Sequence, residues 1–342
     1  MGMFDIMENQ YILITGGAGF IGSHAVRVFI QQGYNVVIFD NLSRGFREAV
    51  TTLQAIGAVE FIQGDIRRKN DIEKAFAKYN IIGVIHFAAV CSVEESMKFP
   101  EFYFENNIIG AYNLFETMRE NGVKNIIFSS SCAVYANSEY LPIDEKHPTI
   151  PLNPYGESKL QTERLLYWYQ SIHDFNYIIL RYFNVCGCAF DGIIGDSKKP
   201  SLLLIQNAVR GAMCIEPFQF TYAPVDTPDG SPIRDYIDVE DLVDAHYNAY
   251  QCLLENDESY IINLGSGCGY SVKEIVAQVE NEFSTTIKKI PEAKRRQSEN
   301  AVLYADINQA KNILKWNPKK SILDSIVSLK HWYSTHPNGW ND

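Results

Sequence analysis

The segment from residue 11 to residue 32 constrains the fold more than any other part of the chain. Tyr11–Thr15 is a short apolar run that predicts a buried strand, and Phe20–Gln32 has the length of a helix that Gly33 ends. Between them lies the sequence GGAGFIG, residues 16–22. The glycines at its first, fourth and seventh positions permit a tight turn, close approach of the backbone to a pyrophosphate, and close helix–strand packing. This order of elements predicts a dinucleotide-binding unit.

An acidic residue at the end of the next predicted strand favours NAD as the dinucleotide. Asn35–Asp40 is the second predicted strand, and Asp40 lies 24 residues after Gly16. A carboxylate at this place can accept hydrogen bonds from the adenosine ribose hydroxyls, and it repels the extra phosphate of NADP. Arg44 is near enough in sequence to attract that phosphate instead. A glycine-rich turn that binds nothing is the less favoured alternative.

The first two-thirds of the chain continues to alternate predicted strands and helices. The further strands are Val59–Ile62, Gly83–Ala88, Asn125–Ser129 and Tyr177–Arg181, and the further helices are Asp71–Tyr79, Glu101–Asn121 and Tyr155–His173. Such alternation predicts an α/β protein with a Rossmann-type, doubly wound parallel sheet that binds ligands at the carboxyl ends of its strands.

The pattern changes after residue 184. An amphipathic helix, Leu202–Met213, lies between two loop-like stretches rich in glycine or proline. Val239–Leu254 and Tyr260–Leu264 predict a helix and a strand that return to the main sheet, and the rest of the chain is predicted to be mostly helical. We therefore expect an NAD-binding domain of residues 9–185 with about 235–268. The expected substrate-binding lobe is about 186–234 with 269–342, and the substrate is expected between the two.

Composition narrows the possible partners. The formal net charge of −11 disfavours nucleic acid or an anionic membrane surface as the main partner. A few arginines can still bind a diphosphate in an acidic protein.

No apolar run approaches the ~20 residues that span a bilayer. The seven cysteines lack zinc-like spacing, which predicts free thiols, no metal site and a cytoplasmic location.

Two groups of polar residues are candidates for catalysis. Tyr155 and Lys159 lie four residues apart at a predicted helix start, and therefore share one face of that helix. A lysine ammonium beside a phenol favours the phenolate, so the tyrosine can act as a base near neutral pH. Ser131 closes a serine run at the end of a predicted strand, where it can hold a substrate oxygen or relay a proton. A Tyr–Lys pair alone more often forms a helix surface, but a complete dinucleotide motif beside it predicts an active site.

The glycine motif, the serine run and the Tyr-x-x-x-Lys pair together resemble the extended short-chain dehydrogenase/reductase family, from about Gln10 to Trp340. Further segments resemble its UDP-glucose 4-epimerase branch. These segments are Gly16–His24, Asp40–Leu42, His86–Ala89, Asn106 with Asn107, Ser129–Tyr135, Arg181–Asn184, Asp229–Val239, Asn263–Gly267, Arg295 with Arg296, and His336–Trp340.

The resemblance implies a role for each matching residue. Tyr155 would be the catalytic base, Lys159 would bind the nicotinamide ribose and tune Tyr155, and Ser131 would assist at the sugar O4. Besides Tyr155 and Lys159, the implied NAD contacts are Gly16, Gly19, Phe20, Ile21, Gly22, Asp40, Asn41, Asp65, Ile66, Phe87, Ala88, Ala89, Asn106, Ser129 and Tyr182. Besides Ser131 and Tyr155, the implied substrate contacts are Phe183, Asn184, Arg234, Arg296 and Glu299.

The activity implied by the resemblance is reversible C4 epimerisation of a UDP-hexose of the UDP-glucose/UDP-galactose type. Tyr155 would take the O4 proton while the C4 hydride moves to bound NAD⁺, and the 4-keto sugar would turn over before the hydride returns. Related dehydratases and decarboxylases place acids where this chain has Cys132 and Ala133, which cannot protonate a leaving group. The resemblance also implies a homodimer joined through the Tyr155 helix, which carries the aromatic run Tyr167–Tyr169.

Several departures from the family pattern leave the sugar open. Cys91 replaces a usual lysine near NAD, and Lys199–Ser201 replaces paired asparagines near the expected uracil site. Glu299 replaces an aspartate, and Leu303 replaces a tyrosine that excludes N-acetylated sugars. An epimerase of a UDP-N-acetylhexosamine, UDP-uronate or UDP-pentose is therefore the main alternative. A sugar-nucleotide dehydratase or reductase and a noncatalytic NAD-binding protein are less favoured.

Overall fold

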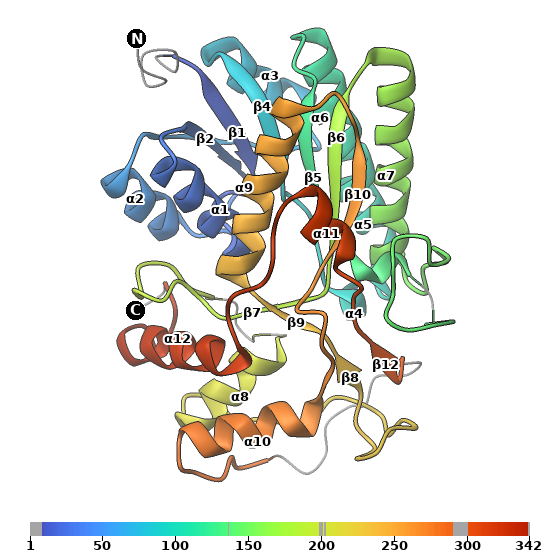
Figure 1. The fold of residues 1–342 in the computed structure, drawn as a ribbon. Coiled ribbons are helices and arrows are strands. Elements are labelled where there is room, and N and C mark those ends of the chain that lie inside the picture. The colour runs from blue at the N-terminus through green and yellow to red at the C-terminus, as the bar shows by residue number, and fades with distance from the viewer. Residues whose placement is uncertain (1–8, 136, 198–200, 202, 290–299, 341–342) are drawn as a thin grey trace. The chain divides into compact units, whose positions relative to one another are not determined.

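The computed structural model describes residues 9–135, 137–197, 201, 203–289 and 300–340 (Figure 1). Two compact units are distinguished by their internal contacts. The first contains the described residues within 1–136, 148–181 and 243–262, and the second contains those within 137–147, 182–242 and 263–342.

A seven-stranded parallel sheet forms the centre of the first unit, with the order β10-β6-β5-β4-β1-β2-β3 (Figure 1). The strands are β1 Tyr11–Thr15, β2 Asn35–Asp40, β3 Val59–Gln63, β4 Ile81–His86, β5 Asn125–Ser131, β6 Asn176–Tyr182 and β10 Tyr260–Leu264. Strand β1 pairs with both β2 and β4 in parallel, so the chain order reverses at β1. The predicted doubly wound fold is confirmed, and the predicted strand Tyr260–Leu264 joins the sheet beside β6.

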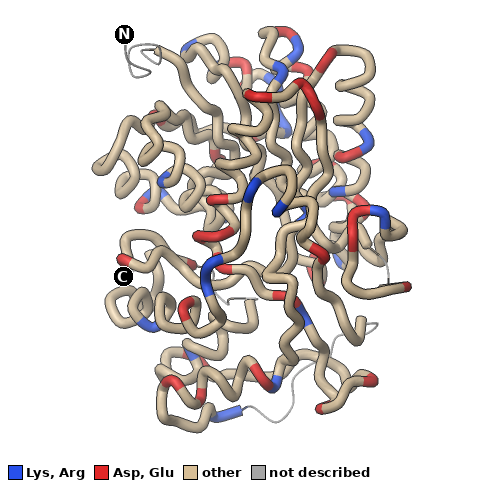
Figure 2. Tube along the Cα trace, in the orientation of Figure 1, with Lys and Arg blue, Asp and Glu red and all other residues tan. Residues whose placement is uncertain are grey.

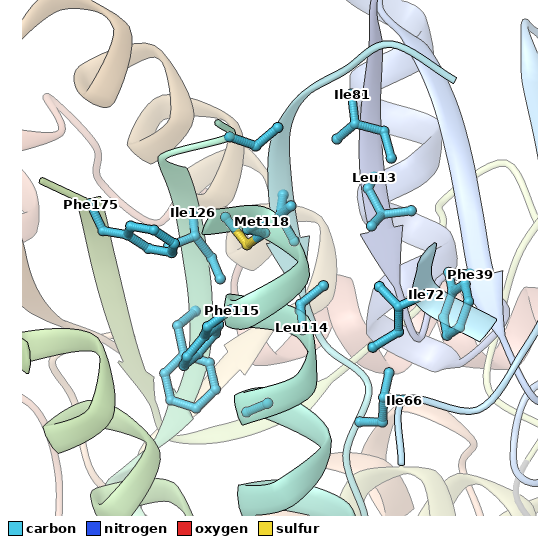
Figure 3. Packing of buried hydrophobic residues seen from close by; sticks show 14 of the residues in the cluster. Leu13, Phe39, Ile66, Ile72, Ile81, Leu114, Phe115, Met118, Ile126 and Phe175 are labelled. Carbon is cyan, nitrogen blue, oxygen red and sulfur yellow. The ribbon is translucent and has the colours of Figure 1, made fainter. Parts of the chain in front are cut away.

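Helices cover both faces of this sheet. They are α1 Phe20–Gln31, α2 Arg47–Ile56, α3 Lys69–Lys78, α4 Val93–Ser96, α5 Pro100–Phe104, α6 Gly110–Glu120, α7 Pro154–His173 and α9 Val239–Glu255. On one face, Leu114, Phe115 and Met118 of α6 pack with Leu13 of β1 and Ile126 of β5 (Figure 3). Neighbouring strand residues that point to the opposite face are also buried, as a parallel sheet between two helical layers requires.

Aromatic side chains cover the opposite face of the sheet. The ring of Phe29 on α1 lies 5.7 Å from the ring of Tyr250 on α9, measured between centroids. Tyr250 packs directly on β4, because a Cβ at Gly83 would lie 2.6 Å from its ring. Helices α1 and α9 therefore close this side of the sheet.

Two elements of the first unit differ from the prediction. The helix predicted at 101–121 is three pieces, because a π-helical turn, Glu105–Ile109, separates α5 from α6. Helix α2 was not predicted; its buried residues are only Ala49, Val50 and Leu53, and Ile56 is exposed at its end. A helix with so narrow an apolar face resembles a loop in sequence.

The second unit consists of short strands and four helices among its described residues. Strand β7 (Asn184–Cys186) pairs with β9 (Tyr236–Asp238), and β8 (Ile233–Arg234) lies between β11 (Tyr270–Ser271) and β12 (Val302–Leu303). The helices are α8 Leu204–Ala212, α10 Val272–Glu282, α11 Asn308–Ile313 and α12 Ile322–Thr335. Apolar residues of α8, α10 and α12 form one buried core.

The expected domain boundaries differ from these two units at four segments. Residues 137–147, 182–185, 235–242 and 263–268 were assigned to the NAD-binding domain but share most contacts with the second unit. The two-domain division therefore remains a prediction. Charged residues of both signs occur along both units (Figure 2). Among the described residues, no helix has the length and apolar character that a membrane crossing requires.

Candidate active site

The predicted glycine turn connects β1 to α1, and two of its glycines are required by packing. Gly16 has φ +72°, and a Cβ there would lie 2.7 Å from the backbone nitrogen of Ala88. A Cβ at Gly22 would lie 2.1 Å from the Gly16 carbonyl oxygen. Gly19 caps α1 without a side-chain hydrogen bond, and the first turn of the helix has no acidic residue. Its leading amides therefore suit an anionic group such as a pyrophosphate.

Asp40 closes β2 beside this turn. Its Oδ2 accepts a hydrogen bond from the Ala18 amide (3.1 Å) and its Oδ1 accepts one from the Leu42 amide (2.8 Å). Burial raises the pKa of the carboxyl group, and the two amide bonds oppose that shift. Each oxygen keeps capacity to accept a further bond from a ribose hydroxyl. Asp40 thus fits the adenosine role predicted for it.

Arg44, the residue that made NADP a possibility, is engaged elsewhere. Its Nη2 donates to both carboxylate oxygens of Glu95 on α4, at 2.7 and 2.6 Å. A guanidinium held in this way is not aimed at a phosphate beside Asp40. The arrangement favours NAD.

Three further predicted NAD contacts, Asn41, Asp65 and Ile66, lie after β2 and β3. Asn41 Nδ2 donates to Asp65 Oδ2 (3.3 Å), and Arg67 forms an ion pair with the same carboxylate (2.6 Å). Hydrogen bonds from Arg67 lower the pKa of Asp65 to about 2. Ile66 is buried against Gly110, where a Cβ would lie 2.6 Å from the Ile66 side chain.

The segment that follows β4 is fixed to the end of β1. Thr15 Oγ1 lies 2.7 Å from His86 Nδ1 and accepts a hydrogen bond from the Ala88 amide (3.3 Å). Burial lowers the pKa of His86 to about 3, so its imidazole is neutral. Phe87, Ala88 and Ala89, all predicted NAD contacts, are half-buried on this segment.

The π-helical turn places two asparagines inside the protein. Asn106 was predicted to contact NAD, and its Nδ2 donates to Asn107 Oδ1 (3.0 Å). Asn107, not predicted as a site residue, accepts from the Val90 amide (2.9 Å) and donates to Ser158 Oγ (2.9 Å). It therefore joins the segment after β4 to the helix that carries Tyr155. Two adjacent asparagines inside a helical run were the available signal, because asparagine is unfavourable there.

The predicted catalytic residues lie where α7 begins against the end of β5. Asn153 caps α7 by accepting a hydrogen bond from the Gly156 amide (2.8 Å). A Cβ at Gly156 would lie 2.1 Å from the Ala133 carbonyl oxygen, so this helix start packs directly on the turn after Ser131. Tyr155 and Ser131 are both buried there, and Ser131 Oγ accepts a hydrogen bond from the Ala133 amide (3.1 Å).

Lys159 points from α7 to the same strand end. Its Nζ donates to the Ser129 carbonyl oxygen (2.8 Å) and lies 5.0 Å from the ring centroid of Phe128. Burial lowers the pKa of Lys159 to about 8, while Cys91 and Glu163 oppose the shift. The lysine is therefore close to its titration point near neutral pH.

Apart from Ser131 and Tyr155, the predicted substrate residues that the structure describes lie in the second unit. Asn184 Nδ2 donates to the Asp235 carbonyl oxygen (3.0 Å), and Arg234, the last residue of β8, precedes Asp235. Leu303 pairs with Arg234 in the neighbouring strand. Phe183 is buried and Tyr182 half-buried at the end of β6. Arg296 and Glu299 lie outside the described residues.

Asp235 organises this group and was missed by sequence reasoning. Its buried carboxylate accepts hydrogen bonds from the amides of Ser266 (2.6 Å), Gly267 (3.1 Å) and Ala305 (3.1 Å). These partners come from distant parts of the chain, so no local pattern identifies them.

We expect Asp40→Asn to weaken discrimination against NADP by at least about tenfold, because it removes the charge that repels the 2′-phosphate. Cofactor content of protein unfolded and refolded with NAD or NADP measures this effect. Arg44→Ala is the matched control and should leave the preference unchanged. The assignment of NAD preference to Asp40 would be contradicted if Arg44→Ala lost the preference for NAD over NADP while Asp40→Asn kept it.

Known proteins of one family are similar to this chain over nearly its whole length. Residues 12–265 match the model of the NAD dependent epimerase/dehydratase family. A UDP-glucose 4-epimerase of Halalkalibacterium halodurans is 41% identical over 337 residues, covering 96% of this chain and 97% of that protein. The structure of UDP-glucose 4-epimerase from Bifidobacterium longum in complex with NAD⁺ and UDP has a TM-score of 0.91 and 35% identity, covering 96% and 100% of the two chains. The UDP-Glc/GlcNAc 4-epimerase of Campylobacter jejuni has a TM-score of 0.81 and 35% identity, covering 95% and 99%. The chain belongs to the NAD-dependent epimerase/dehydratase family.

Proposed function

We propose that this protein catalyses the reversible C4 epimerisation of a UDP-hexose, interconverting sugars of the UDP-glucose and UDP-galactose type. The observation that carries the proposal is the placement of Tyr155 and Lys159. Both lie on the first turns of α7, which packs on the end of β5 through Gly156 and the Ala133 carbonyl. Strand β5 and strand β1, which the glycine turn follows, belong to one parallel sheet. Their carboxyl ends therefore lie at the same edge of that sheet.

Tyr155, Lys159 and Ser131 have different roles in the reaction at the sugar O4. Bound NAD supplies the acceptor, and then the donor, for the C4 hydride. Tyr155 removes the O4 proton and later returns it. Lys159, when charged, stabilises the phenolate form of Tyr155 and so makes this transfer possible near neutral pH. Ser131, whose Oγ is held by the Ala133 amide, orients O4.

Residues after Ser131 restrict the reaction to this exchange. Cys132 carries a thiol in place of a carboxyl group and Ala133 has no ionisable group, so neither position has the acid that related dehydratases use for elimination. The protein is thus an isomerase with no net oxidation or reduction. Its NAD leaves each turnover in the form in which it began.

A UDP-N-acetylhexosamine is the second candidate substrate. Leu303 is buried and pairs with Arg234. Arg234 is proposed to bind the diphosphate together with Asn184 and Arg296, and Glu299 is proposed to accept hydrogen bonds from the uridine ribose. A leucine is shorter than the tyrosine of the family pattern and leaves room for a larger C2 substituent. A relative named for activity on both UDP-Glc and UDP-GlcNAc is 35% identical to this chain.

Incubation of the purified protein with UDP-galactose, without added NAD, tests the proposal. We expect UDP-glucose as the product, detected by chromatography. Tyr155→Phe should reduce kcat by at least about 100-fold, because proton transfer at O4 is lost. Tyr167→Phe, a change on the exposed face of the same helix, is the matched control and should keep wild-type activity.

Two results would contradict the proposal. One is unchanged UDP-galactose and unchanged UDP-N-acetylgalactosamine after incubation with NAD. The other is full activity of Tyr155→Phe. Turnover of the N-acetylated sugar alone would shift the substrate to the second candidate.

We also propose that the protein is a homodimer joined through α6 and α7. These helices pack on each other and expose Tyr112, Trp168 and Ile172. Exposed aromatic and aliphatic side chains on neighbouring helices are typical of a subunit interface. The seven free cysteines support a cytoplasmic location, where thiols stay reduced.

The expected effect of Trp168→Glu is a shift from dimer to monomer, because a charge in an apolar interface is costly to bury. Analytical ultracentrifugation measures the shift. Leu323→Glu places the same charge at an exposed leucine of α12 and should leave the assembly unchanged. A monomeric wild-type protein would refute the proposed interface.

A further inference from the structure

A buried ion pair lies behind the proposed catalytic residues and takes no part in the chemistry described above. Glu163 on α7 and Arg181 on β6 are each only 4% exposed. Arg181 Nη2 lies 2.5 Å from Glu163 Oε2, and Arg181 Nε lies 3.0 Å from Oε1. This two-point contact fixes the carboxylate plane as well as its position.

The same pair binds the strand and turn that carry the serines. Ser130 Oγ donates to Glu163 Oε1 at 2.5 Å, and Ser130 lies between Ser129 and Ser131. Arg181 Nη1 donates to the hydroxyl of Tyr135 at 3.1 Å. The ion pair therefore links α7, β5, β6 and the turn after Ser131.

Sequence spacing places Glu163 on the catalytic face of α7. It follows Lys159 by four residues and Tyr155 by eight, so the three side chains lie along one side of the helix. Fixing Glu163 to Ser130 thus fixes the rotation of α7 about its axis. That rotation determines where Tyr155 and Lys159 point relative to the serines.

Stability is a poor explanation for this arrangement. The cost of removing two charges from water generally matches or exceeds their mutual attraction, and apolar residues of similar volume often stabilise a fold better. A buried, fully hydrogen-bonded pair instead fixes geometry, because any displacement leaves a charge without its partner.

We propose that Glu163 is a positioning residue for the epimerisation: its carboxylate holds the catalytic face of α7 in register with the end of β5 and places a negative charge one helical turn from Lys159. This inference rests on the proposed function of the site.

Several charged or titratable groups surround the Lys159 ammonium. His86 on β4 is neutral, and Cys91 follows β4. Tyr155 and Glu163 lie on its own helix, and Arg181 partly offsets the charge of Glu163. Cys91 and Glu163 both raise the pKa of Lys159 against the effect of burial. Removing the Glu163 charge must therefore lower that pKa.

Two variants separate the positioning effect from the charge effect. Glu163→Gln keeps the side-chain shape but leaves Arg181 without its partner. The double variant Glu163→Gln/Arg181→Met removes both charges and so avoids an unpaired buried cation. Glu157→Gln removes a half-buried carboxylate of α7 that bonds Gln161 and is the matched control.

The pH dependence of kcat and KM for UDP-galactose is the primary measurement. In the wild type, activity should fall as pH rises through the pKa of Lys159, about 8. In Glu163→Gln, this fall should move to lower pH by about half a unit or more. In both Glu163 variants kcat should drop at least about tenfold with little change in KM, because misplaced reacting groups slow the chemical step. Glu157→Gln should behave as wild type.

A nuclear magnetic resonance titration of the Lys159 side chain makes the result independent of turnover. An inactive wild type would count against the proposed function, whereas the Lys159 titration would still test the influence of Glu163. If Glu163→Gln fails to fold, the double variant supplies the kcat comparison. Wild-type kcat in the double variant, or an unmoved Lys159 titration in a folded Glu163→Gln, would overturn the inference.

Discussion

Close backbone contact at the carboxyl edge of the sheet is the constraint on which the rest of the site depends. Gly22 lies against the Gly16 carbonyl, Gly16 lies against Ala88, and Gly156 lies against the Ala133 carbonyl. Each contact leaves no space for a Cβ. Together they bring the starts of α1 and α7 onto the strand ends, where helix amides, serines and the Tyr–Lys pair can act on a common ligand.

Burial and charge then tune the side chains that this backbone positions. Water is excluded from Lys159, whose pKa falls to about 8, and the ammonium is held by a carbonyl rather than by a carboxylate. A direct ion pair would stabilise the charged lysine more strongly and weaken its response to Tyr155. The carboxylate of Glu163 lies one helical turn away, and Arg181 partly offsets its charge. The site thus holds Lys159 as a cation whose pKa responds to the groups around it.

Local sequence patterns predicted the elements that are determined by residues close together in the sequence. The glycine turn, the strand pattern and the Tyr155 helix follow from residue spacing and were placed within a few residues. The π-helical turn at Glu105–Ile109 was not predicted, because it depends on the bonds that Asn107 makes with Val90 and Ser158. Asp235 and the Glu163–Arg181 pair were missed for the same reason: their partners are distant in sequence. Two-residue strands such as β8 carry too few residues for a period to be recognised.

The fate of the hydrogen at C4 tests the proposed reaction most directly. UDP-galactose carrying deuterium at C4 should yield UDP-glucose that keeps the deuterium at C4, in ordinary water and without added NAD. Retention is expected because Tyr155 exchanges only the O4 proton, while the C4 hydrogen leaves and returns within one active site. Loss of the deuterium to solvent, or its absence from C4 of the product, would contradict the mechanism.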